Sequence, residues 1–193
     1  PDWPQRSELF VFYTTTGGSP YLDRVSRFSL AGDDTLNEGS EEVLLDINEL
    51  AKGHAHCDVG DLEPSAATQR VIAYSVDFKG DEIYDIFVAD PAVKDGVLPK
   101  TLETIKETDG DIAWGIDDSL LFYVTKDEAK RSHKLWMHVL GTPQIDDVCF
   151  VTEDDELFSV GCGKTKEGNH LIVHIGSTEP SEQTLIDLRC LSA

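Results

Sequence analysis

The sequence is dominated by one repeated pattern, two short apolar segments separated by a polar turn. The segments are rich in Val, Ile, Phe and Tyr and are bounded by Gly, Asp, Asn and Pro, which is typical of β-strands joined by turns. Three copies begin at Arg70, Ser119 and His170, about 50 residues apart, and a fourth copy fits residues 9–30. Weaker strand-like segments flank these pairs at 42–47, 57–62, 101–105, 110–116, 146–152 and 157–163. The pattern therefore predicts a unit of four antiparallel strands that occurs about four times.

One small sheet of this kind cannot bury both of its faces, but sheets stacked around an axis cover one another. The 50-residue spacing is close to the length of one propeller blade, so it favours a propeller over a β-sandwich of similar strands. We predict an all-β chain, residues 1–193, that forms part of one β-propeller domain. The approximate blades are 1–50, 51–108, 109–153 and 154–193. A helical pattern is visible only at 43–53, where we expect about one turn of helix ended by Gly53.

The net charge of −21 limits the classes of partner. Nucleic acids and anionic lipids are bound through clustered Lys and Arg, which this chain lacks, so we expect no nucleic-acid or membrane partner. Basic peptides would be attracted by such a charge. For an individual acidic run, such as 153–156, solubility is the favoured explanation.

The cysteines and the chain ends indicate the setting of the protein. The four cysteines form no CxxC pair, and the sequence contains neither a signal peptide nor a long apolar run. We therefore expect a reduced, cytoplasmic protein. The chain begins at Pro1 instead of Met, which predicts that it is a piece of a longer one.

The stretch 161–168, GCGKTKEG, contains the Gly-Lys-Thr that ends a phosphate-binding P-loop. A P-loop also needs a glycine at the position of Phe158 and a helix that begins at the lysine. The following residues read instead as a strand. We therefore predict a hairpin turn, with Gly168 and Asn169 at its tip.

Other candidate sites are equally weak. His170 and His174 lie on one face of a predicted strand but about 13 Å apart, too far to share an ion. His54 and His56 have no ligand cluster around them, and 108–111, TDGD, reads as a turn rather than a calcium loop. The stretch 17–20, GGSP, is not a nucleophile elbow. We expect Trp3, Trp114 and Trp136 to lie in the core or between blades. We put forward no catalytic, cofactor-binding or metal-binding residue and no cofactor.

Longer stretches resemble the propeller of the prolyl oligopeptidase family of serine peptidases, and within it the oligopeptidase B group. They extend from about residue 9 to 188 and match the first blades in order and spacing. The stretch 63–71 departs from the family, which commonly has Ser-Pro-Asp-Gly before the next strand. The stretch 130–133, KRSH, replaces the usual Arg-Pro. The matching segments are 41–60, 70–90, 111–128, 134–142, 155–178 and 181–188.

This resemblance implies a longer parent with a seven-bladed propeller and a separate α/β-hydrolase domain. That domain would carry a Ser-Asp-His triad outside this sequence, and none of the family's catalytic residues matches a position here. The resemblance further implies cleavage of short peptides after Arg or Lys, with the propeller acting as a filter that keeps folded proteins out. The expected partners are the parent's own hydrolase domain and short basic peptides. Open blade faces are also expected to favour self-association.

A second reading remains open, in which the chain is a complete four-bladed propeller that serves as a protein-binding module. The start at Pro1 argues against this reading, as does the absence of the Gly-His and Trp-Asp signature of one large propeller class.

Overall fold

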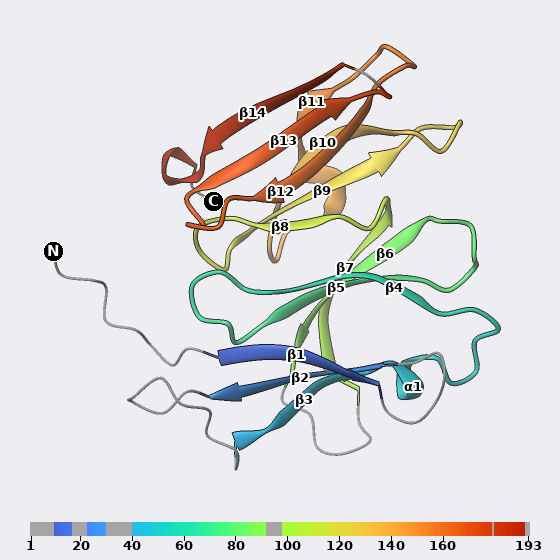
Figure 1. Cartoon of the computed structure of the whole chain (residues 1–193), viewed down its shortest axis with the longest axis vertical. Coiled ribbons are helices and arrows are strands. Elements are labelled where there is room, and N and C mark those ends of the chain that lie inside the picture. The colour runs from blue at the N-terminus through green and yellow to red at the C-terminus, as the bar shows by residue number, and fades with distance from the viewer. Residues whose placement is uncertain (1–9, 17–22, 30–39, 92–97, 179, 192–193) are drawn as a thin grey trace, which may run out of the picture. The chain divides into compact units, whose positions relative to one another are not determined.

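A computed structural model describes residues 10–16, 23–29, 40–91, 98–178 and 180–191 (Figure 1). Its strands are antiparallel throughout the described residues, which confirms the all-β prediction. The chain divides into two compact units. The first comprises 1–55 with 90–100, and the second comprises 56–89 with 101–193. No helix among the described residues is both long enough and apolar enough to cross a membrane.

The first unit contains a three-stranded sheet of β1 (Phe10–Thr16), β2 (Asp23–Ser29) and β3 (Glu42–Asp46). The short helix predicted within 43–53 is present as α1 (Ile47–Leu50). It begins where the carboxylate of Asp46 accepts the backbone N–H of Asn48 at 3.0 Å, a typical N-cap. Gly53 follows with a φ of +84°, a conformation that suits glycine at the end of a helix.

The second unit contains three sheets, in each of which the strands pair in chain order. Each sheet begins with one of the segments predicted to precede a strand pair, at 57–62, 110–116 and 157–163. The last of the three sheets has three strands among the described residues. The strands are β4 (Asp58–Pro64), β5 (Ile72–Asp77), β6 (Tyr84–Asp90) and β7 (Lys100–Thr108), then β8 (Ile112–Trp114), β9 (Leu120–Lys126), β10 (Ser132–Val139) and β11 (Val148–Thr152), and finally β12 (Ser159–Lys164), β13 (His170–Gly176) and β14 (Ser181–Asp187).

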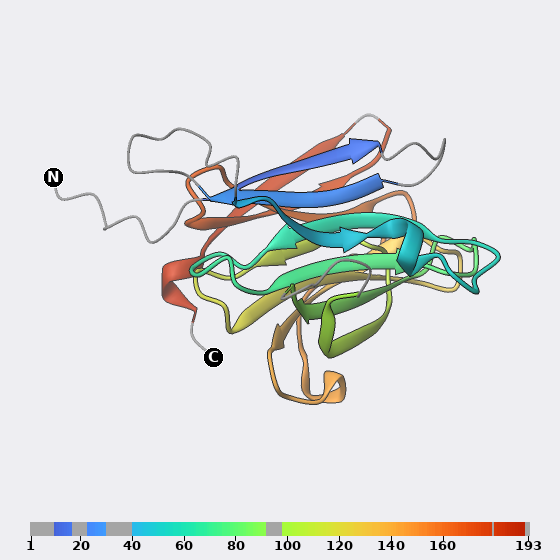
Figure 2. The same cartoon turned by 90° about the horizontal axis from the view of Figure 1, so that it is seen from below.

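Two short 3₁₀ turns follow the third strand of the second and third of these sheets. They are η2 (Gln144–Asp146) and η3 (Leu188–Cys190). Figure 2 shows the connection between β10 and β11, which carries η2, extending away from its own sheet.

The core explains why β9 reads as an unbroken apolar run. Leu121 and Tyr123 face one cluster, which also holds residues of the sheet β4–β7. Phe122 and Val124 face a second cluster, which also holds residues of the sheet β12–β14. A strand buried on both faces needs apolar side chains at every position. The middle sheet is therefore covered on both sides by its neighbours.

The buried residues of the two clusters are all aliphatic or aromatic. Trp114 is 2% exposed within the first cluster, and Trp136 packs against that cluster, as predicted for both. Trp3 lies outside the described residues. The first cluster consists of Ala73, Ile86, Val88, Ile105, Ile112, Trp114, Leu121 and Tyr123, and the second of Ala113, Phe122, Val124, Leu135, Val160, Leu171, Val173 and Leu188.

The 50-residue spacing reappears in the hydrogen bonds between neighbouring sheets. The indole N–H of Trp114 donates to the carbonyl of Glu63, 51 residues earlier, at 3.0 Å. The backbone N–H of Ala67 donates at 2.9 Å to Asp118, 51 residues later. Lys164 Nζ lies 2.5 Å from the carbonyl of Gly115, 49 residues earlier. Equivalent positions of successive sheets are therefore in contact, as stacked copies of one unit require.

Candidate functional site

The stretch 161–168 forms the predicted hairpin. Gly161 to Lys164 complete β12, and β13 begins at His170. The N–H of Gly168 donates to the carbonyl of Thr165 at 2.8 Å, and Gly168 has a φ of +76°. A strand rather than a helix follows the Gly-Lys-Thr sequence, so no helix N-terminus is available there to hold a phosphate.

The other motifs also take ordinary positions. His170 and His174 share one face of β13, as their spacing on a strand requires. Thr108 ends β7, and the next residues form a turn in which Gly110 has a φ of +108°. The Nε2 atom of His56 lies 3.9 Å from a carboxylate oxygen of Asp77. The stretch 17–20 lies outside the described residues.

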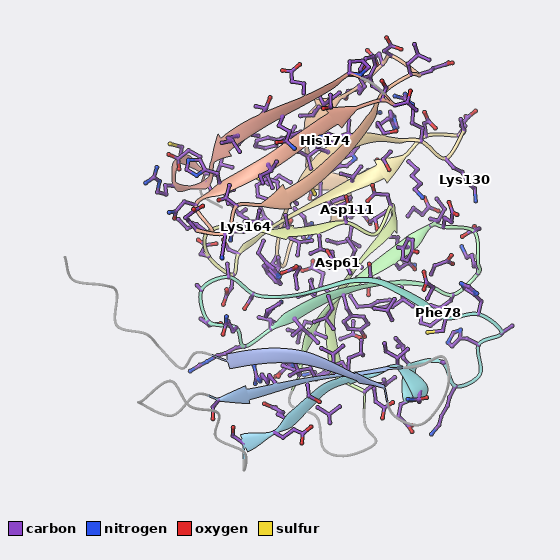
Figure 3. All side chains as sticks on the ribbon, in the orientation of Figure 1. Asp61, Phe78, Asp111, Lys130, Lys164 and His174 are labelled. Carbon is purple, nitrogen blue, oxygen red and sulfur yellow. The ribbon has the colours of Figure 1, made fainter. Side chains whose placement is uncertain are left out.

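The site that sequence reasoning missed is a row of carboxylates at the first strands of the sheets β4–β7 and β8–β11. Asp61 of β4 accepts the backbone N–H of Ile112, in the next sheet, at 3.3 Å. Asp111, which is 50 residues later, accepts the backbone N–H of Cys162 in the sheet after that. An aspartate thus joins each of two successive pairs of sheets, and Figure 3 labels both aspartates. The recurrence of Asp at positions 61 and 111 is the sequence signal that could have revealed it.

The carboxylate of Asp109 lies beside this row. Its Oδ2 accepts the hydroxyl of Ser132 at 2.7 Å, and its Oδ1 accepts the N–H of Asp111 at 3.1 Å. Burial, followed by the negative charge of Asp111, raises the pKa of Asp109 to about 6 despite these hydrogen bonds. Asp109 is therefore the carboxyl group of the row that changes charge closest to neutral pH.

The neighbours of Asp109 show the same electrostatic strain. Asp111 is an exposed residue, and partial desolvation by the neighbouring sheet raises its pKa. Burial together with the charge of Asp111 raises the pKa of Asp61. Burial and nearby carboxylates raise the pKa of the Cys162 thiol. Burial lowers the pKa of Lys164, although the carboxylate of Glu63 opposes that effect. Desolvation, more than repulsion between the carboxylates, is thus the main cause of the raised pKa values in this row.

A hollow of about 470 Å³ lies at one end of this row, between the sheets β4–β7 and β8–β11. Asp77 accepts the backbone N–H groups of Lys79, Gly80 and Glu82 at 2.7–2.8 Å. Burial alone would raise the pKa of Asp77, but these three donors outweigh it and lower the pKa. The hollow is lined by His56, Asp58, Asp77, Gly80, Glu82, Tyr84, Asp109 and Lys126.

The chemistry of the hollow is that of an acidic surface. The Tyr84 hydroxyl donates to Asp58 at 2.7 Å, and Lys126 Nζ donates to the carbonyl of Glu82 at 2.7 Å. Within the described part of the chain, no three His, Cys, Asp or Glu residues are grouped so that they could hold a metal ion. All four cysteines are free thiols. The arrangement can attract cations.

Comparison with known proteins identifies a family and several similar proteins. The family described as "Prolyl oligopeptidase, N-terminal beta-propeller domain" matches residues 2–191. The chain is similar to dipeptidyl aminopeptidase BI of Pseudoxanthomonas mexicana, with 34% identity over 90% of this chain and 22% of that protein.

Two solved structures of oligopeptidase B are also similar. The enzyme from Leishmania major has 34% identity and a TM-score of 0.83, over 95% of this chain and 25% of that one. The enzyme from Trypanosoma brucei, solved with covalently bound antipain, has 39% identity and a TM-score of 0.79, over 93% of this chain and 24% of that one. The chain thus spans about a quarter of the length of these relatives.

The raised pKa of Asp109 predicts how stability depends on pH. The ordinary pKa is 3.8 and the folded value is about 6, so folding favours the protonated carboxyl. The contribution of Asp109 to the free energy of unfolding is therefore greatest below pH 4 and is lost as the pH rises through 6. Asp109→Asn should raise the free energy of unfolding at pH 8 by about 1–3 kcal/mol and change it little at pH 4.

Urea denaturation of both proteins at several pH values measures this difference. Asp154→Asn, which removes one charge at an exposed position, is the matched control and should have little effect at either pH. Equal effects of Asp109→Asn at pH 4 and pH 8 would show that the ionisation of Asp109 does not strain the fold.

Proposed function

The chain belongs to the prolyl oligopeptidase family, as part of its N-terminal β-propeller domain, and from this we propose that it is the non-catalytic propeller portion of a serine oligopeptidase resembling oligopeptidase B. The observation that carries this proposal is the family match over residues 2–191, together with the stacked sheets that repeat every 50 residues. The ranges 1–50, 51–108, 109–153 and 154–193 are proposed as successive blades of one domain.

The catalytic step is assigned to an α/β-hydrolase domain outside this chain, consistent with the quarter of its relatives that the chain spans. A serine of that domain would attack the scissile carbonyl while a histidine takes its proton, and water would then release the acyl group. The propeller would cover that site and admit only short, flexible peptides. Its own residues would supply part of the wall of the enclosed space.

Preference for basic peptides is supported by the charge of the chain. A net charge of −21 attracts cations over a distance, and the hollow that contains Asp58, Asp77 and Asp109 adds a local negative field. The similarity to oligopeptidase B at 34–39% identity supports cleavage after Arg or Lys. The free state of the four cysteines supports a reducing compartment such as the cytoplasm, which fractionation of cells can test.

The second candidate, a complete propeller that only binds other proteins, is less well supported. The relatives with 34% identity or more are named as peptidases and are about four times longer than this chain. The complete reading frame that contains this chain distinguishes the two candidates directly. Further blades followed by a G-x-S-x-G sequence support the peptidase, whereas a stop codon soon after Ala193 supports the binding module.

Peptide cleavage by the complete protein is the primary test. An amino-terminally blocked fluorogenic peptide with Arg before the scissile bond should be hydrolysed, and a matched peptide with Gln at that position should react at least about tenfold more slowly. Replacement of the nucleophilic serine of the hydrolase domain by alanine should abolish the reaction. The 193-residue chain alone should show no turnover.

The informative comparison is a peptide that has a free amino terminus and only two residues before the scissile bond. It is informative because one relative is named a dipeptidyl aminopeptidase. If only that peptide is cleaved, the protein removes dipeptides and the proposed internal cleavage is wrong. If neither peptide is cleaved by a folded complete protein, the peptidase proposal itself is wrong.

The filter role predicts a dependence on substrate length. Peptides with one Arg and lengths of about 10, 20 and 40 residues should show kcat/KM values that fall steeply with length, because longer chains cannot enter a covered site. An unfolded protein substrate should be nearly inert. Similar kcat/KM values across the series, measured by chromatography of the products, would contradict the filter role.

Self-association of the isolated chain is proposed through the last sheet. Gly163, Ile172 and Leu185 are neighbours across β12, β13 and β14, on the face opposite Leu171 and Val173. Leu185 is 59% exposed, so this face offers apolar surface to a second copy. Sedimentation velocity should show an average mass that increases with protein concentration, and Leu185→Lys should reduce this increase.

Leu157→Lys is the matched control, because Leu157 is also exposed but lies in the connection before β12. It should leave the association unchanged. A monomer at all concentrations, or an equal effect of both substitutions, would exclude this face as the interface.

A further inference from the structure

A further hollow of about 470 Å³ lies at the contact between the sheets β8–β11 and β12–β14. It is formed by the connection between β11 and β12, the end of β13 and the turn between β13 and β14. Pockets that bind small ligands have volumes of about 300–1,000 Å³. We call this hollow the β13 pocket. The residues that give it its chemistry are Phe158, Ile175, Pro180, Glu153, Asp155 and Glu182.

The floor of the β13 pocket is apolar. Ile175 lies opposite Val160 of β12 and packs against the second core cluster, to which Val160 belongs. The pocket therefore lies on the face of this sheet that packs against β8–β11, and not on the face that is available to a further sheet. Phe158 and Ile175 are each half-buried, so part of their apolar surface is accessible to a ligand. Such a floor suits the methylene groups of a long side chain.

Three carboxylates surround this floor. Glu182 lies directly opposite Ile175 in the pairing of β13 with β14, so it shares the face of Ile175. Glu153 and Asp155 belong to the connection between β11 and β12. Glu153 Oε1 accepts the N–H of Asp155 at 2.8 Å, and Asp155 Oδ1 accepts the N–H of Leu157 at 3.0 Å. These bonds hold both side chains in place and keep their negative charge.

The described residues that line the β13 pocket include no Lys, Arg or His, whereas Lys126 and His56 line the hollow beside Asp109. The charge of the β13 pocket is therefore not balanced from within. A metal ion does not fit, because no three His, Cys, Asp or Glu in the described part of the chain are grouped to hold one. An organic cation with an apolar stem matches both the carboxylates and the floor.

The shape of the pocket is fixed by one arginine. The guanidinium of Arg131 donates to the carbonyls of Asp155 at 2.8 Å, Phe158 at 2.6 Å and Glu153 at 3.1 Å. Its Nε donates to the carboxylate of Asp127 at 3.0 Å, which pairs its charge. Three lining residues thus have their backbone held in place before any ligand arrives. Preorganisation of this kind lowers the cost of ordering on binding.

We propose that the β13 pocket binds the side chain of an arginine or lysine in a peptide substrate. The methylene groups of that side chain lie on Phe158 and Ile175, and its charged end lies among the three carboxylates. A single exposed ion pair contributes little, so the carboxylates and the apolar floor act together. The inference rests on the peptidase function proposed above, which makes basic peptides the substrates.

Fluorine NMR of the complete protein, with 4-fluorophenylalanine in place of Phe158, tests the pocket directly. The nucleophilic serine of the hydrolase domain is replaced by alanine so that the peptide is not cleaved. The probe is a short peptide, blocked at both ends, with one Arg among Gly, Ala and Ser. Its addition should shift the signal at position 158 to saturation. The same label in place of Phe87, which is half-buried on β6, should not respond.

Two comparisons separate the charge from the shape. A peptide with citrulline in place of Arg keeps the shape without the charge and should bind at least about tenfold more weakly at position 158. Glu182→Gln should raise the Kd of the Arg peptide about three- to tenfold. Glu156→Gln is the matched control, because Glu156 is exposed in the same connection as Asp155 but does not line the pocket. It should change the Kd less than about twofold.

An unchanged signal at position 158 up to millimolar peptide would overturn the proposal. Equal binding of the citrulline peptide, or equal effects of Glu182→Gln and Glu156→Gln, would also overturn it. The readout is binding, so it is independent of the test for peptide cleavage. Cleavage by the unmodified protein without a response at position 158 would remove the pocket and leave the peptidase. A response without cleavage would do the reverse.

Discussion

The structure depends on one constraint, that each sheet must bury two apolar faces and can do so only against another sheet. β9 shows this most clearly, because Leu121 and Tyr123 enter one cluster while Phe122 and Val124 enter the other. Burial of such side chains is the main favourable term in folding, at roughly 1.5–3 kcal/mol for each large residue. The middle sheet therefore gains its stability from both neighbours, and the local hairpins alone would not supply it.

Polar groups then fix the register of the stacked sheets. Asp61 and Asp111 lie 50 residues apart, and the carboxylate of each accepts an N–H group from the following sheet. At the third equivalent position the residue is Gly161, so this carboxylate bond has no counterpart on β12. The connection between β10 and β11 adds Gln144, which accepts the N–H of Lys106 at 3.0 Å, and Asp147, which lies 2.7 Å from Nδ1 of the buried His138.

The sequence predicted the elements whose side chains repeat and missed the contacts that depend on tertiary placement. The pairs that begin at Arg70, Ser119 and His170 are readable because alternation and turn residues are local signals. The hairpin at Gly168 and the end of the helix at Gly53 follow from backbone conformations that suit glycine. In contrast, the sequence of residues 108–111, TDGD, predicts a turn but not the carboxylate row to which Asp109 and Asp111 belong. The raised pKa of Asp109 arises from burial between sheets, which no local pattern encodes.

The measurement that tests the central claim most directly is a crystal structure of the complete protein. We expect the sheets to continue around a ring, with the face that carries Gly163 and Ile172 covered by the next sheet and the bonds between sheets again joining residues about 50 apart. Contradiction would come from a structure in which that face packs against a helix or remains open to solvent.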